Sequence, residues 1–187
     1  PQILTLKKEF RSVFKSSFEG GSLYEIDFIS LEPRVALNLA KGDDGQDDVY
    51  KCFVDTHGLQ ITRDTAKLAV LCALYGAGTS KLTRVLKQDN SKVTARQLLS
   101  KISAFFGVND LTDVLKSQSK SGYITNYFGR PIEIDDNRGS ILVNNFLQST
   151  ASDLAIHAFS SFSEDKKFPA LPVFIIHDAL IVDVMPG

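Results

Sequence analysis

Strand-like apolar runs lie near both ends of the chain, and each carries an aspartate. Residues 23–29 are rich in β-branched and aromatic side chains, which predicts a strand around Asp27. Residues 172–184 predict two short strands that meet near His177 and Asp178. Both carboxylates are therefore expected in or beside a strand, although they are far apart in the sequence.

Helical periodicity occupies most of the region between these runs. Thr62 is predicted to N-cap a helix that begins at Arg63, and Gly76 and Gly78 are predicted to end it. Pro33 suits the first turn of an earlier helix. The other expected helices are 32–40, 79–88, 92–106, 110–120 and 138–163. The remaining segments are expected as a short strand or turn of helix at 9–18, an acidic solvated loop at 42–48 and a hairpin at 122–131.

The length and composition indicate how many domains the protein has and which cellular compartment suits it. With 187 residues, 43% of them hydrophobic, the chain fits one domain, or one lobe of a larger protein, with a buried core. It shows neither an apolar run long enough for a membrane span nor a signal-peptide pattern. Cys52 and Cys72 suit a reducing compartment such as the cytoplasm, and both are expected as small buried residues. Because the chain opens on Pro1 without an initiator methionine, we expect a trimmed piece of a longer protein.

The net charge of −1 conceals a strong asymmetry along the chain. Residues 63–130 carry 11 basic and 4 acidic side chains. The flanks are acidic, with 7 basic and 10 acidic side chains in residues 1–62 and 3 basic and 8 acidic in residues 131–187. This pattern suits a lobe that binds a polyanion on a base that binds metal, and a solvated helical surface explains it equally well.

Five side chains together indicate chemistry on phosphates. Asp27 and Asp178 are acids that can hold metal ions. Arg63 and Lys67 stand four residues apart on the expected helix, so they share one face, and Tyr75 lies near the same side. Acids for metal ions and cations for phosphates are what phosphoryl or nucleotidyl transfer requires.

Five short motifs occur in one order along the chain. They are Asp27-Phe-Ile-Ser-Leu-Glu-Pro-Arg34; Arg63, Lys67 and Tyr75-Gly76 separated by three and seven residues; Gly122-Tyr123 with Phe128-Gly129-Arg130; Asn144 and Gln148 in the long helix; and His177-Asp178. In these spacings the chain resembles a family A DNA polymerase, the DNA polymerase I type, over nearly its whole length.

The resemblance implies an α+β fold. A polymerase palm, made of a small antiparallel sheet with packed helices, would carry a helical fingers insertion. Residues 1–62 and 131–187 would form the palm, and residues 63–130 would form the fingers. The thumb, any exonuclease domain and the primer-grip motif would precede Pro1. The implied function is template-directed DNA synthesis, with dNTPs and primer–template DNA as partners, together with a processivity factor or other replication proteins and no membrane. The source would be bacterial or phage.

The resemblance also implies the catalytic roles. Asp27 and Asp178 would hold two Mg²⁺ ions, for which Mn²⁺ can substitute, with help from the backbone carbonyl of Phe28. Arg63 and Lys67 would bind the incoming triphosphate, and Lys67 would donate a proton to the pyrophosphate. The plain alternative for the two cations is an exposed basic pair.

Further residues would select the nucleotide and hold the DNA. Glu32 would crowd the sugar 2′-position, and Tyr75 would stack near the templating base; the alternatives are a helix N-terminal acid and a core side chain. The DNA-binding residues would be Tyr75, Gln148, Asn144, His177 and Arg130, with Gln148 in the minor groove. Solvated polar groups, and a structural role for His177, are the alternatives.

Three positions depart from the family. Ala179 stands where a Glu is usual, so a third carboxylate is absent. Leu71 replaces an aromatic ring that would pack on the nucleotide sugar, and Ser140 replaces an Arg, although Arg138 is close. These departures leave open a catalytically weak or inactive nucleic-acid-binding module. A third possibility, an unrelated phosphohydrolase with two aspartates, is disfavoured because it has no need of Tyr75.

Overall fold

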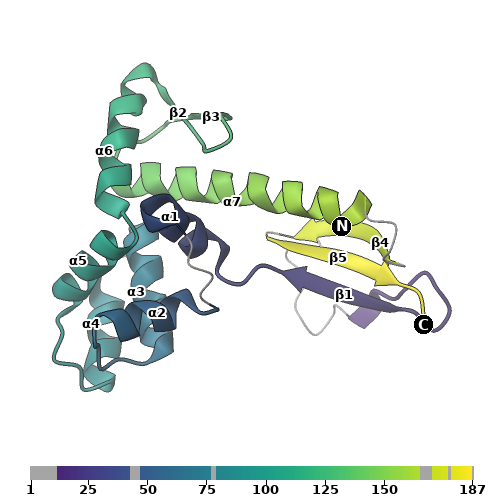
Figure 1. Cartoon of the computed structure of the whole chain (residues 1–187), viewed down its shortest axis with the longest axis horizontal. Coiled ribbons are helices and arrows are strands. Elements are labelled where there is room, and N and C mark those ends of the chain that lie inside the picture. Colours follow the sequence, from purple (N-terminus) through teal and green to yellow (C-terminus); the bar gives the residue numbers. More distant parts are fainter. Residues whose placement is uncertain (1–11, 43–46, 77–78, 165–169, 177, 187) are drawn as a thin grey trace. The chain divides into compact units, whose positions relative to one another are not determined.

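The structure is a computed structural model that describes residues 12–42, 47–76, 79–164, 170–176 and 178–186 (Figure 1). The chain divides into two compact units, one of residues 1–29 and 151–187 and the other of residues 30–150. These bounds differ from the predicted ones at 62 and 130, and the names palm and fingers stay predictions. No helix in the described ranges is long and apolar enough to cross a membrane.

The first unit is built on a three-stranded antiparallel sheet in the order β1–β5–β4 (Figure 1). The strands are β1 (Ser22–Asp27), β4 (Ala170–Ile176) and β5 (Ala179–Val184). The strand predicted at 23–29 and the strand pair predicted at 172–184 are therefore confirmed. Ile176 pairs with Ala179, so only two residues join β4 to β5.

The central strand β5 is tied to the segment that precedes β1. Asp183 is only 5% exposed and carries a carboxylate. It accepts hydrogen bonds from the Ser16 hydroxyl (2.5 Å) and from the backbone N–H and hydroxyl of Ser17 (both 2.7 Å). These donors hold the pKa of Asp183 below its usual value. This contact was not predicted from the sequence.

The second unit is mainly helical. Its elements are α1 (Leu31–Lys41), α2 (Val49–Thr56), α3 (Arg63–Tyr75), α4 (Thr79–Gln88), α5 (Ala95–Phe105), α6 (Val108–Gln118), the 3₁₀ turn η3 (Ser119–Ser121), β2 (Tyr123–Thr125) and β3 (Pro131–Glu133). The long helix α7 (Gly139–Glu164) contributes residues to both units. Each predicted helix is present to within three residues at either end, and the hairpin is confirmed as β2–β3. Helix α2 was not predicted.

The core of the second unit surrounds α3. This helix packs against α2, α4 and α5, and Ala66, Ala69 and Val70 are fully buried. An aromatic cluster forms beside it, in which Phe53 lies against Phe105 and Phe106. Cys72 is buried, as expected, whereas Cys52 is half-buried, and both thiols are free.

Both ends of α3 form as the sequence predicted. The Thr62 hydroxyl accepts a hydrogen bond from the Thr65 N–H (3.2 Å). Gly76 ends the helix in the left-handed conformation, with φ +66°. A Cβ built on Gly76 would lie 2.5 Å from the Cβ of Ser140. Glycine is therefore required here by the backbone angle and by the neighbouring helix.

We predict that Gly76→Ala lowers the free energy of unfolding more than Gly58→Ala does. Gly58 also has a positive φ, +57°, but its added Cβ would meet nothing within 4 Å. The Gly58 variant should lose about 1 kcal/mol through strain alone, and the Gly76 variant about 2–3 kcal/mol because a clash is added. Urea unfolding of both variants measures the difference, and equal losses would show that Ser140 moves aside freely.

Candidate active site

The sheet brings the two predicted metal-binding aspartates to the same end. Asp27 is the last residue of β1 and pairs with Ala179 of β5. Asp178 directly precedes Ala179, in the two-residue turn after β4. Asp27 is exposed and Asp178 is half-buried. Two carboxylates that are 151 positions apart in the sequence therefore become neighbours where β1 ends and β5 begins.

The Asp27 carboxyl responds to this neighbour. Its pKa is raised from the ordinary value, first by partial burial and second by the negative charge of Asp178. The backbone N–H of Phe28 acts in the opposite direction but does not cancel these effects. Glu25 adds a further rise; it lies two residues before Asp27 on the same strand, and therefore on the same face.

The donor atoms at this edge fit a divalent cation. Two like-charged carboxylates repel each other, and a cation between them would remove that cost. The described residues contain no group of three or more His, Cys, Asp or Glu side chains that could hold a metal. Mg²⁺ is usually bound by one or two carboxylates together with water and substrate phosphates, so a pair is enough. The Phe28 ring packs on Phe159, with centroids 5.3 Å apart, and follows Asp27 directly. His177 lies outside the described residues.

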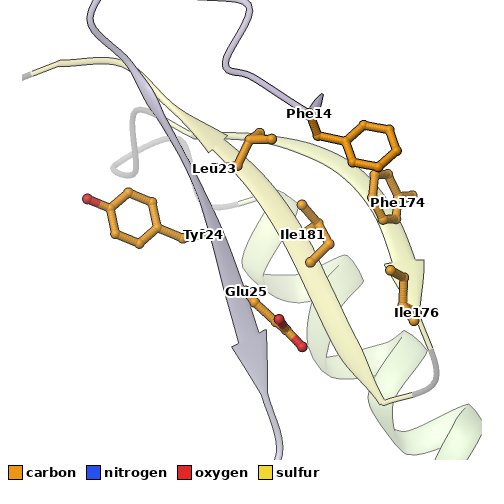
Figure 2. Close-up of a pocket in the computed structure, with 7 residues that line it drawn as sticks. All are labelled: Phe14, Leu23, Tyr24, Glu25, Phe174, Ile176 and Ile181. Atoms are coloured by element: carbon orange, nitrogen blue, oxygen red, sulfur yellow. The ribbon is translucent and has the colours of Figure 1, made fainter. Parts of the chain in front are cut away.

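Beside the acids, one face of the sheet carries a shallow apolar hollow of about 210 Å³ (Figure 2). It is lined by Phe14, Leu23, Tyr24, Glu25, Phe174, Ile176 and Ile181. In Figure 2 the ring of Phe14 lies next to that of Phe174. Glu25, which pairs with Ile181 across the strands, lines the hollow and stands two residues before Asp27. Glu25 was not among the predicted site residues, although its two-residue spacing from Asp27 was the available signal.

In the second unit, Arg63 is held by a carboxylate that the sequence analysis assigned to a solvated loop. The guanidinium Nε of Arg63 donates to Oδ2 of Asp48, and its Cζ lies 5.3 Å from the ring centre of Tyr50. Oδ1 of Asp48 accepts from the backbone N–H of Tyr50 (3.0 Å) and Lys51 (3.1 Å), which caps α2. Burial tends to raise the pKa of Asp48, but these hydrogen bonds outweigh it and lower the pKa.

The other predicted nucleotide-binding residues lie along α3 and at the start of α1. Lys67 is exposed one turn after Arg63, while Leu71 and Tyr75 are half-buried on the following turns. Glu32 is half-buried in the first turn of α1, and its charge raises the pKa of Tyr50, after burial, which is the main cause. Glu32, Tyr50 and Arg63 therefore share one neighbourhood, and their roles stay predictions.

Besides Tyr75 on α3, the predicted DNA-binding residues of the second unit lie on α7 and the β2–β3 loop. Gln148 is exposed, and Asn144 stands one turn earlier on α7. The buried Oδ1 of Asn144 has no hydrogen-bond partner among the described residues. Arg130 donates to the hydroxyl of Ser149 (2.9 Å), which docks the loop on α7. Arg130 therefore makes a structural contact that was not predicted from the sequence.

Part of the basic region forms a concave surface between α4 and α5. It encloses about 420 Å³ and is lined by Lys87, Lys92 and Arg96 together with hydroxyl-bearing and apolar residues. No acidic residue lines it. This surface offers three cations to a polyanion without a competing carboxylate in its lining.

Comparisons with known proteins lead to DNA polymerases, although no family model matches the chain. It is 26% identical over 172 residues to a DNA polymerase of Mycobacterium phage L5, covering 88% of this chain and 28% of that protein. It is 28% identical over 181 residues to a DNA polymerase of Mycobacterium phage D29, covering 88% and 29%. The chain thus spans less than a third of the length of these relatives.

The fold is similar to that of a polymerase domain. The structure is similar to the POL domain of Pol1 from M. smegmatis in a complex with DNA primer-template and dNTP, with a TM-score of 0.69 and 20% sequence identity. The match covers 100% of this chain and 38% of that one. The expected α+β fold of a polymerase-domain fragment is therefore confirmed, and so is the resemblance to DNA polymerases.

We predict that the Asp27 carboxyl titrates above its ordinary pKa of about 3.9 and that Asp178→Asn lowers this value. Burial remains in the variant, so part of the rise should remain. Carboxyl ¹³C NMR against pH measures both. Glu25→Gln should lower the pKa less, because its charge is the smallest of the causes.

The raised pKa of Asp27 determines how its contribution to the free energy of unfolding changes with pH. Because the folded pKa of Asp27 is raised, its contribution is full below the unfolded pKa and is lost as pH rises through the folded pKa. Since Asp27 is largely exposed, the effect should be roughly a few tenths of a kcal/mol. An Asp27 titration that Asp178→Asn leaves unchanged would show that the two charges do not interact.

Proposed function

We propose that this chain is the catalytic core of a template-directed DNA polymerase of family A, which adds dNTPs to a primer 3′-hydroxyl. The observation that carries this proposal is the pair of carboxylates at one sheet edge, Asp27 and Asp178, in which one charge raises the pKa of the other. The similarity to phage DNA polymerases supports the same reading.

In this proposal Asp27 and Asp178 hold two Mg²⁺ ions, with the carbonyl of Phe28 as a further ligand. Bound metal would activate the primer hydroxyl and stabilise the charge on the leaving pyrophosphate. Arg63 would bind the triphosphate with its planar fork, and Lys67 would act as a point charge and give a proton to the pyrophosphate. Mn²⁺ can substitute for Mg²⁺, since both accept oxygen ligands.

Further side chains would select the nucleotide and hold the primer–template. Glu32 would crowd the sugar 2′-position, and Tyr75 would stack near the templating base. Leu71 gives the sugar an aliphatic contact instead of an aromatic one. Gln148 would read the minor groove, and Asn144 would assist it. His177 and Arg130 would contact the DNA backbone. We also propose that the protein works with a processivity factor or other replication proteins, in the cytoplasm of a bacterium or of a phage-infected cell.

A second candidate is a nucleic-acid-binding module that keeps this fold but turns over poorly. Position 179 favours it, because Ala179 pairs with Asp27, is only 4% exposed and supplies no third acid. The two candidates differ in one measurement. Both bind primer–template, and only the polymerase extends it with metal and dNTPs.

We predict that Asp27→Asn and Asp178→Asn each lower metal-dependent primer extension by at least about 100-fold in the full chain. The physical reason is the loss of a metal ligand with little change in volume. Extension of a labelled primer with Mg²⁺ or Mn²⁺ measures the loss. Glu164→Gln, an exposed acid at the end of α7, is the matched control and should keep the parent rate. Full extension by both aspartate variants would exclude the two-metal site.

We also predict that the basic surface between α4 and α5 contributes to DNA binding. Replacing Lys87, Lys92 and Arg96 together with Gln should weaken binding and make the slope of log K against log salt shallower by about two to three. Fluorescence anisotropy of a primer–template at several salt concentrations measures the slope. The control replaces Lys101, Lys116 and Lys120 with Gln; these three cations are exposed but lie outside this surface. An equal change in both sets would mean that the effect is one of net charge alone.

A further inference from the structure

Asp48 divides its two carboxylate oxygens between two tasks. Oδ1 accepts the backbone N–H groups of Tyr50 and Lys51 at the start of α2. Oδ2 accepts Nε–H of Arg63, which lies 15 positions further along the chain at the start of α3. One side chain therefore fixes the end of one helix and the guanidinium of the next.

The contact engages Arg63 from two sides. Asp48 takes its Nε–H, and Tyr50, only 2% exposed, presents a ring whose centre is 5.3 Å from Cζ. A guanidinium carries five donors, and the Nε bond uses one of them. The two terminal nitrogens, which carry the other four, make no hydrogen bond to the described residues. Those terminal nitrogens can bind two phosphate oxygens in parallel.

We propose that Asp48 is a positioning residue that orients Arg63 toward the triphosphate of an incoming nucleotide. This inference rests on the proposed function, in which Arg63 binds the triphosphate. A long exposed side chain loses rotamer freedom when it binds a ligand, and a partner that holds it beforehand removes part of that cost. The Tyr50 ring and the Asp48 carboxylate together limit the positions open to the guanidinium of Arg63.

Asp48→Asn removes both a negative charge and a partner of Arg63, and these two losses should change phosphate binding in opposite directions. Removal of a negative charge near a phosphate site should by itself tighten anion binding. Loss of the partner for Nε should weaken it. Asparagine keeps an oxygen for the α2 cap and is as good an N-cap as aspartate, so the helix is retained. Its amide nitrogen cannot accept from Nε–H.

The experiment measures binding of inorganic tripolyphosphate without metal, and of dATP with Mg²⁺, by calorimetry on the full chain. We expect Asp48→Asn to weaken both by roughly two- to tenfold. The control is Asp55→Asn, an exposed acid on the same helix that removes the same charge, and it should bind equally well or slightly tighter. In an Arg63→Lys background, Asp48→Asn should no longer weaken binding, because an ammonium has no fork to orient, and only the charge effect (equal or slightly tighter binding) should remain.

The outcomes separate this inference from the proposed function. Unchanged or tighter binding by Asp48→Asn overturns the positioning role, even if the protein extends primers. The expected tripolyphosphate pattern in a protein that does not extend primers supports the positioning role and counts against the polymerase. Absence of tripolyphosphate binding in the parent chain overturns the positioning role as well, since Arg63 would then have no phosphate to receive.

Discussion

The antiparallel pairing of β1 with β5 is the constraint on which the proposed metal site depends. Asp27 meets Asp178 only because β1 ends opposite Ala179 and because two residues join β4 to β5. A slip of one residue would turn Asp27 to the other face of the sheet. The register is protected in three ways: β5 is paired on both edges, Leu180 and Val182 are buried, and Asp183 is tied to Ser16 and Ser17.

Local signals explain which parts of the fold could be predicted from the sequence. Helix α3 begins at Arg63 and ends at Gly76 because its cap and its terminating glycine are chemical features of single residues. Helix α2 was missed for the opposite reason. It has eight residues, too few for a clear period, and its Asp48 cap stands at the end of an acidic run that resembles a loop. An aspartate followed by Val49, Tyr50 and Phe53 was the signal available.

Contacts between distant residues explain what could not be predicted. Asp183 is an ordinary strand residue in the sequence, and its burial follows from two serines more than 160 positions away. The bond between Arg63 and Asp48 requires α2, so overlooking that helix also hid the bond. The motifs were recognised because a resemblance carries information about distant pairing that local propensity lacks. Asp27 and Asp178 were associated in this way, and the strand register then provided the physical reason.

The absence of a third acid at position 179 affects the ionisation of Asp27, whose pKa is already raised. A glutamate in place of Ala179 would add a negative charge to an edge where Asp178 and Glu25 already disfavour ionisation of Asp27. Alanine therefore makes the metal-free site easier to ionise, while it also leaves fewer ligands for the ion. In the proposed function, the metal ligands would be Asp27, Asp178, backbone carbonyls and the phosphates of the substrate. Under the same proposal, a site with so few protein ligands would bind its metal best when nucleotide phosphates supply the remaining oxygens.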